Sequence, residues 1–280
     1  MRWSIPHERT GGDVMKEEKQ KPTLGAILQL SGVDLIHPGG FDITKRIGEI
    51  VDMKGKTILD VACGSGTLPC YYAGNFGAKV VGVDLDPGMI KSSIEKAKKE
   101  GVEDLTEFRV ADALALPFED NSFDAAISEC AVTLTSDHQK CLDEMARVTK
   151  PGGNVVIHEN TWLKEISEAE KAEKAGKLGG APHTLSEWKG MMEKAGLTGL
   201  RTEDWSGLEN VYKIRHDRKM RNLDDIFSLR EKMFIVFPKM ISMYGLKGIS
   251  YYKSAQKTNP LHFYVDGTLG YFLIRGEKSL

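Results

Sequence analysis

Three aspartates at regular intervals could bind the polar groups of one small ligand. Asp60 precedes a glycine turn that contains Gly64 and Gly66, Asp84 follows 24 residues later, and Asp112 follows after a further 28. Each lies at the end of an apolar stretch, and the carboxyl ends of strands are where open α/β sheets bind ligands. The second acid can accept hydrogen bonds from ribose hydroxyls and the third from an adenine amino group. The pattern predicts a nucleoside-binding crevice, with a glycine turn that the ligand can approach closely.

The glycine turn also indicates which nucleoside cofactor fits. Residues 64–66 read GSG rather than GxGxxG, and no GxxxxGK[ST] phosphate loop occurs in the sequence. A polyanionic dinucleotide would therefore lack its usual phosphate site. S-adenosylmethionine combines adenosine with a zwitterionic amino-acid tail, which suits acidic strand ends. We predict this cofactor, with Asp60 near its ammonium group.

Polar residues near the other strand ends are candidates for the chemical step. In-line attack on a sulfonium methyl is accelerated largely by bringing the nucleophile to near-attack distance, so a conspicuous acid or base is not required. Glu129 follows the fourth predicted strand, His158 and Glu159 end the fifth, and His37 lies in a His-Pro-Gly-Gly turn. A role as an ordinary strand-end hydrogen bonder is the alternative for each. His158 is the preferred candidate for a base.

Alternating strands and helices are predicted to position these residues. The N-terminal helix should begin at Asp42 as N-cap, because apolar residues at 43, 47, 50 and 51 then share one face. Strands alternating with helices imply right-handed βαβ crossovers and a parallel sheet. The predicted strands span 57–62, 79–83, 106–110, 123–128, 154–159, 200–205 and 264–275.

The sequence predicts that the chain is divided into three parts. Residues 1–22 are expected to form a mobile N-terminal arm, 23–206 and 263–280 the ligand-binding core, and 207–262 a helical lid inserted before the last strand. The composition, with 280 residues, 41% apolar residues and a net charge of -2, is that of a globular protein. Four cysteines form no CxxC pair and no metal-ligand spacing, so neither a metal site nor a disulfide framework is predicted.

Positive charge gathers in the predicted lid. Residues 211–257 contain eleven Lys or Arg against four Asp or Glu, a net charge of about +7. These residues could form a solvated helical cap, attract an anionic substrate, or rest on an anionic membrane through the apolar run 233–237 and admit a lipophilic acceptor. No ordered module for nucleic-acid recognition occurs. Since the sequence has no membrane span and no signal-peptide core, a cytoplasmic protein is expected. No oligomeric state follows from the sequence.

Four motifs in order resemble the class I S-adenosylmethionine-dependent methyltransferases. They are ILDVACGSG at 58–66, VGVDLD at 81–86, ADALALPFEDNSFD at 111–124 and EMARVTKPGG at 144–153. The last two are similar to the small-molecule branch, which includes ubiquinone/menaquinone C-methyltransferases and arsenite methyltransferases. The resemblance implies a doubly wound, Rossmann-like α/β fold with a seven-stranded, mostly parallel sheet whose last strand is antiparallel. The cofactor contacts that it implies are Asp60, Ala62, Gly64, Gly66, Asp84, Leu85, Asp112, Ala113 and Glu129.

Two departures from the family patterns qualify the resemblance. Ala62 stands where glycine is frequent, a conservative change that should not abolish cofactor binding. Cys130 resembles the thiolate that arsenite methyltransferases use, but the cysteines expected before Cys63 and after Cys141 are absent, so a small buried cysteine is the favoured interpretation.

We therefore predict methyl transfer from S-adenosylmethionine to a small-molecule or lipophilic acceptor. The alternatives are an RNA or protein methyltransferase, a nucleotide-dependent oxidoreductase, and a catalytically silent cofactor-binding protein.

Overall fold

A computed structural model of the chain describes residues 27, 37–214, 220, 223–257 and 261–280. The predicted mobile arm, 1–22, lies outside the described residues. The chain divides into two compact units, one of Leu35–Leu223 with Pro260–Leu280, the other of Asp224–Asn259 with Met1–Asp34. The lid predicted at 207–262 stays a prediction. Among the described residues, no helix has the length and apolar content needed to cross a membrane.

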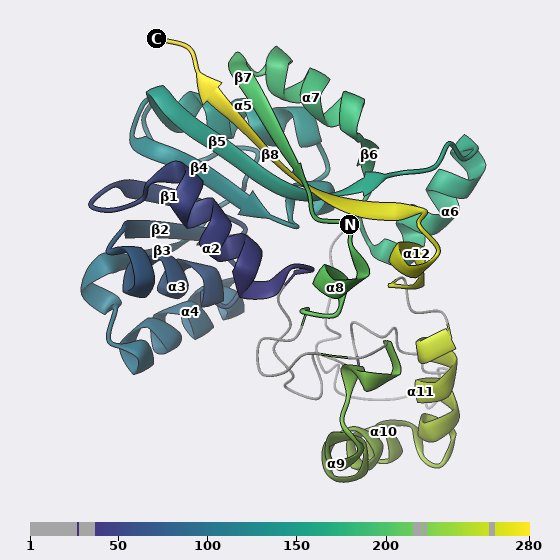
Figure 1. Cartoon of the computed structure of the whole chain (residues 1–280). Coiled ribbons are helices and arrows are strands. Elements are labelled where there is room, and N and C mark those ends of the chain that lie inside the picture. The colour runs from purple at the N-terminus through teal and green to yellow at the C-terminus, as the bar shows by residue number, and fades with distance from the viewer. Residues whose placement is uncertain (1–26, 28–36, 215–219, 221–222, 258–260) are drawn as a thin grey trace, which may run out of the picture. The chain divides into compact units, whose positions relative to one another are not determined.

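The larger unit is built on one twisted sheet (Figure 1). Its path runs β3-β2-β1-β4-β5-β8-β7, and β6 pairs with β5 outside this path. Strands β1 to β5 are parallel along the path, whereas β8 is antiparallel to both of its neighbours, β5 and β7. The strands are β1 Thr57–Val61, β2 Lys79–Asp84, β3 Thr106–Val110, β4 Phe123–Glu129, β5 Thr149–Trp162, β6 His183–Thr184, β7 Leu197–Asp204 and β8 Leu269–Lys278.

This architecture confirms the predicted doubly wound sheet with an antiparallel last strand. The strand count is eight rather than seven, because the two-residue β6 adds to the predicted set. The last strand begins at Leu269 instead of 264, since His262–Val265 forms helix α12. Strand β5 starts at Thr149 instead of 154, and its register with β4 shifts between Phe123 and Ala125.

Helices cover both faces of the sheet because side chains alternate along each strand. In β1, Ile58 packs with α2 and α3 on one face, whereas Leu59 and Val61 pack with α5 and α7 on the other. The helices of the larger unit are α2 Gly40–Val51, α3 Thr67–Phe76, α4 Pro87–Glu100, α5 His138–Val148, α6 Glu168–Leu178, α7 Leu185–Lys194, α8 Leu208–Val211 and α12 His262–Val265, with short 3₁₀ turns at Glu103–Leu105 and Val132–Leu134.

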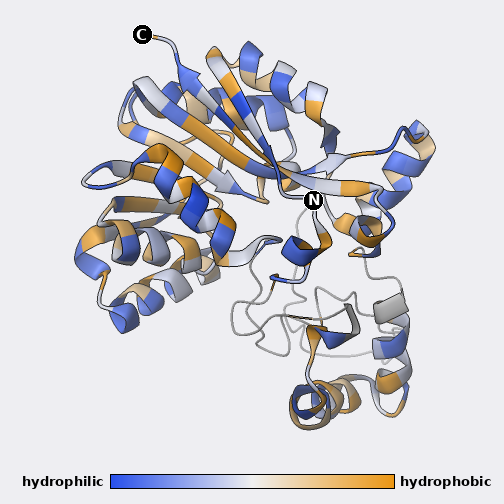
Figure 2. Cartoon of the chain, viewed as in Figure 1, coloured by the Kyte–Doolittle hydropathy of each residue, from blue (hydrophilic) through white to orange (hydrophobic). Residues whose placement is uncertain are grey.

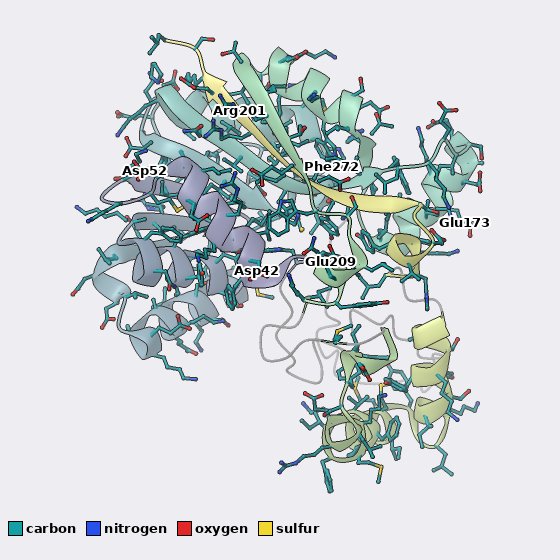
Figure 3. All side chains as sticks on the ribbon, in the orientation of Figure 1. Asp42, Asp52, Glu173, Arg201, Glu209 and Phe272 are labelled. Atoms are coloured by element: carbon teal, nitrogen blue, oxygen red, sulfur yellow. The ribbon has the colours of Figure 1, made fainter. Side chains whose placement is uncertain are left out.

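The start of α2 differs from the prediction. The helix begins at Gly40 with Gly39 as N-cap in the left-handed region, φ 89°, and Asp42 lies in the first turn (Figure 3). Its carboxylate accepts from Lys213 Nζ at 2.7 Å instead of capping the helix. Because glycine tolerates positive φ, the chain passes from His37 directly into the helix, and Gly40 N donates to His37 O at 3.0 Å. This tight entry fixes His37 at the amino end of α2.

The described part of the smaller unit consists of short helices. They are the 3₁₀ turn Leu223–Ile226, α9 Leu229–Glu231, the π-helix Lys232–Val236, α10 Phe237–Tyr244 and α11 Lys247–Lys257. Helices α10 and α11 pack together through Phe237 and Tyr252, whose rings lie 5.4 Å apart edge to face.

Candidate active site

The glycine turn after β1 is tied to the end of β2. Asp84 Oδ2 accepts from Gly64 N at 2.9 Å, and its Oδ1 accepts from Asp86 N at 2.9 Å. A Cβ on Gly64 would meet no atom within 4 Å, so the turn leaves open space at this position. A Cβ on Gly66 would lie 2.7 Å from Ser93 Cβ, so that glycine is required by the packing of α4. Of the two predicted contacts, Gly64 therefore has the open backbone that a ligand needs.

Asp60 is a buried carboxylate without a hydrogen bond to one of its oxygens. Asp60 belongs to β1 and its side chain is buried. Its Oδ2 has no hydrogen-bond partner among the described residues. Burial raises the pKa of Asp60 well above its usual range, and the nearby charges of Glu129 and Asp84 add to this. A cationic group beside Oδ2 would supply both the missing donor and a compensating charge. The ammonium group of S-adenosylmethionine has this chemistry, so the residues present fit the predicted cofactor.

The predicted adenosine contacts lie at the ends of β2 and β3. Leu85 follows β2 and is 69% exposed, which leaves an apolar surface that a planar base could cover. Asp112 is exposed, and its Oδ1 accepts from Leu114 N at 2.9 Å. Ala113 is half-buried beside it. These three side chains come from neighbouring strand ends, as the sequence predicted.

Glu129 is the centre of a buried polar cluster formed by the predicted catalytic residues. It ends β4, and its two oxygens accept from Tyr72 Oη at 2.5 Å and from Thr44 Oγ1 at 3.2 Å. His37 Nε2 lies 2.8 Å from Glu129 Oε2, while His37 Nδ1 donates to Pro38 O at 3.0 Å. Burial by itself would lower the pKa of His37, but the charge and hydrogen bond of Glu129 outweigh it and raise that pKa. His37 and Glu129 therefore form a buried ion pair.

His158 lies against this pair and has the opposite electrostatic character. The His37 and His158 rings meet edge to face with centroids 5.1 Å apart. His158 is buried, Nδ1 lies 3.8 Å from Cys130 Sγ, and Nε2 has no partner among the described residues. Burial and the neighbouring His37 hold the pKa of His158 well below its usual range. The site thus contains one imidazole whose pKa is raised by a carboxylate partner and one whose pKa is lowered and whose Nε2 is unused by the described residues.

The same three residues could ligate a metal ion. One ligand atom each from His37, Glu129 and His158 lies within 4.8 Å of the other two, and all three side chains are buried. Two histidines and a carboxylate are a common ligand set for zinc and other transition metals. The sequence showed no metal-ligand spacing for this group, because its members come from the turn before α2, from β4 and from β5.

Several residues of the site were missed by sequence reasoning. Tyr72 reads as an ordinary apolar position of a helix, and Thr44 as a small residue of another. The ring of Tyr271 in β8 lies tilted against His158, with centroids 4.9 Å apart, and stacks on Tyr264, with centroids 5.1 Å apart. Tyr264 Oη also bonds Asn160 Oδ1. No local pattern identifies these partners, and Tyr271 reaches His158 because β8 pairs with β5.

Glu159, which follows His158 in β5, forms hydrogen bonds with a structural role. Its carboxylate accepts from Val132 N at 2.6 Å and from Thr133 Oγ1 at 3.0 Å. Burial raises the pKa of Glu159 to about 7, although these hydrogen bonds oppose the rise. Glu159 therefore attaches the turn after β4 to β5.

Comparisons with known proteins agree with this geometry. A family model described as a methyltransferase domain matches residues 59–157. The chain is 31% identical over 213 residues to phosphoethanolamine N-methyltransferase 1 of Arabidopsis thaliana, covering 74% of this chain and 41% of that one. It is also 31% identical over 176 residues to an uncharacterized protein of Haemophilus influenzae, covering 61% of this chain and 70% of that one.

Solved structures share the fold at lower identity. Haemonchus contortus phosphoethanolamine N-methyltransferase 2, in complex with phosphomonomethylethanolamine and S-adenosylhomocysteine, gives a TM-score of 0.70 at 23% identity, over 94% of this chain and 59% of that one. The [4+2]-cyclase SpnF gives a TM-score of 0.71 at 19% identity, over 92% of this chain and 93% of that one.

The fold, the ordered motifs and these relatives define one class. The chain belongs to the class I S-adenosylmethionine-dependent methyltransferases. It spans 41% of the Arabidopsis relative and 65% of methyltransferase GfsG of Streptomyces halstedii, less than two thirds of each.

Proposed function

We propose that the protein transfers a methyl group from S-adenosylmethionine to an O–H or N–H group of a small molecule. One observation carries the proposal. Among the described residues, two buried side-chain polar atoms lack a hydrogen-bond partner, Asp60 Oδ2 and His158 Nε2. They lie on β1 and β5, on either side of β4. The first suits a cationic cofactor tail, and the second suits the polar hydrogen of an acceptor.

The chain's own residues would hold the cofactor at the strand ends. Asp60 binds the ammonium group, Asp84 the ribose hydroxyls and Asp112 the adenine amino group, while Leu85 and Ala113 border the base. When bound, S-adenosylmethionine supplies an electrophilic methyl group on a cationic sulfur. The backbone at Ala62 and Gly64 would border the methionine part of the cofactor. Gly66 contributes indirectly, because it lets α4 approach the turn.

His158 would receive the proton of the acceptor at Nε2. Its low pKa keeps the imidazole neutral at physiological pH, so its nitrogen is available without prior deprotonation. The His37–Glu129 pair fixes the position of the neighbouring ring, and Glu129 favours the protonated form of His37 by raising its pKa. Because the two imidazoles have pKa values shifted in opposite directions, we assign proton acceptance to His158 and positioning to His37 and Glu129.

Relatives support a small-molecule acceptor. Their names specify phosphoethanolamine in Arabidopsis thaliana and Caenorhabditis elegans, and tocopherol in Arabidopsis thaliana. Membership in this family speaks against the oxidoreductase alternative. A lipophilic acceptor and the cytoplasmic location predicted from the sequence stay predictions.

Calorimetry with S-adenosylmethionine tests the cofactor site. Asp84→Ala should weaken binding by about 10- to 100-fold, since hydrogen bonds to a charged group contribute about 1.5–3 kcal/mol. Asp104→Ala, at an exposed position in the 3₁₀ turn before β3, is the matched control and should bind like the wild type. Equal binding by Asp84→Ala and the wild type would refute the proposed cofactor site.

Methyl-labelled S-adenosylmethionine tests the reaction. Incubation with a panel of small amines, phosphorylated amines and phenols should yield a labelled product, and absence of any product would favour the silent binding protein. With an acceptor found, His158→Gln should lower kcat by about 10²–10⁴-fold while cofactor binding is kept. His138→Gln is the control, because His138 pairs with His183 at 2.7 Å outside the cluster. Full activity of His158→Gln would remove His158 as the base.

A metal-assisted transfer is the second candidate, favoured by the His37, Glu129 and His158 cluster. A bound divalent ion would lower the pKa of an acceptor hydroxyl in place of a base. Elemental analysis of the purified protein, with activity measured after dialysis against EDTA, distinguishes metal-assisted transfer from proton acceptance by His158. We expect activity to survive EDTA. One equivalent of zinc that is lost in His158→Gln would favour the metal instead.

A further inference from the structure

The smaller unit exposes large apolar side chains on an otherwise well-packed helical segment. Leu229 is 76% exposed and Phe234 75%, and Leu246, between α10 and α11, is 83% exposed. In contrast, Val236 and Met240 of the same segment are buried. The segment therefore has one buried face and one face of exposed apolar side chains.

The π-helix places these apolar side chains together. Phe237 N donates to Lys232 O, five residues earlier, so one turn is wider than in an α-helix. In a helical turn of this width, residues four and five positions apart lie on the same side, which is the spacing of Met233 and Phe234 from Leu229. Met233 is also exposed. In a regular α-helix, Phe234 and Leu229 would lie on different sides of the helix. The wider turn therefore favours an apolar surface that both side chains share.

The charge around this surface is mostly positive. Residues 228–257 contain six Lys or Arg and one acid, Glu231. The Glu231 carboxylate accepts from Ser228 N at 2.6 Å and from Ser228 Oγ at 2.8 Å, as part of a capping box. Arg230, Lys239 and Lys247 are exposed. Figure 2 shows hydrophobic and hydrophilic residues together on α9 and α10.

We propose that this face, defined by Leu229, Arg230, Met233 and Phe234, docks on the surface of an anionic lipid bilayer. The apolar side chains would enter the boundary between headgroups and acyl chains, and the cations would lie against lipid phosphates. A second copy of the chain would bring like charges together, and a nucleic acid would offer phosphates but leave Leu229 and Phe234 in water. An anionic bilayer satisfies both the charge and the apolar surface.

Sedimentation with vesicles tests the proposal on the full chain. Binding should be strong to vesicles of equal phosphatidylcholine and phosphatidylglycerol and absent with phosphatidylcholine alone, and it should weaken as salt increases. Leu229→Ser and Phe234→Ser should each lower the partition coefficient about tenfold. Arg230→Gln should lower it about fivefold, the effect of one cation near an anionic surface. Leu163→Ser, an exposed leucine of the larger unit, is the matched control.

Four outcomes would overturn the proposal. They are no vesicle binding, equal binding to neutral and anionic vesicles, unchanged binding of both serine variants, and an equal loss in Leu163→Ser. A dimer in sedimentation velocity that Leu229→Ser dissociates would instead assign this face to a second copy. Calorimetry with S-adenosylmethionine on the same variants is expected to match the wild type. A failed vesicle experiment is thus distinguishable from a failure of the proposed methyl transfer.

Discussion

Glu159 should make the protein less stable as the pH rises. Its buried carboxyl group has a pKa of about 7, against 4.5 for an ordinary glutamate. Between these values the unfolded chain has released a proton that the folded protein still holds, so rising pH favours the unfolded state across this window. The difference between the two pKa values corresponds to about 3 kcal/mol of stability, lost progressively from about pH 4.5 to just above pH 7.

Replacing Glu159 with glutamine removes this titration while nearly keeping the side-chain shape. Urea unfolding of wild type and Glu159→Gln at pH 5 and pH 8 gives the difference in unfolding free energy at each pH. We expect this difference to change by about 2.5 kcal/mol in favour of the variant between pH 5 and pH 8, because other titrating groups are common to both proteins. Thr133→Val, which removes one hydrogen bond to the ionised carboxylate, should move the midpoint of the change to higher pH. Parallel pH dependences of wild type and Glu159→Gln would refute the reasoning.

Three further changes test other parts of the site. Binding of S-adenosylmethionine should release a proton. Burial raises the pKa of Asp60 in the free protein, and the cationic cofactor favours the ionised form of this carboxyl group. Calorimetry in buffers of different ionisation enthalpy should detect the released proton in the wild type and not in Asp60→Asn. Ala62 has φ 61°, so Ala62→Gly should stabilise the protein by about 1 kcal/mol in urea unfolding, and a loss of stability would contradict the strain. Tyr72→Phe removes a hydrogen bond to Glu129 and should cost about 1.5–3 kcal/mol. Tyr71→Phe on the same helix is its control, and equal costs would count against the bond.

The sheet and the cofactor class were determined by the sequence, because their signals are local. The apolar run 57–61 identifies a buried strand, and positive φ at Gly64 and Gly66 explains the glycines of the turn that follows. Four motifs in order then identify the family. The predicted start of α2 was wrong, because Asp42 is a good N-cap by type, whereas the conformational freedom of Gly39 and Gly40 decides where the chain turns.

The chemistry of the polar cluster was decided only by the tertiary structure. Glu129 meets Tyr72 from 57 residues away and Thr44 from 85 residues away, distances in sequence that no periodicity encodes. The strand order places the end of β4 beside β5, and the turn at His37 brings the first imidazole against Glu129. Burial and this pairing then shift the pKa values of His37 and His158 in opposite directions. Sequence supplied two histidines and a glutamate, and packing made them electrostatically different.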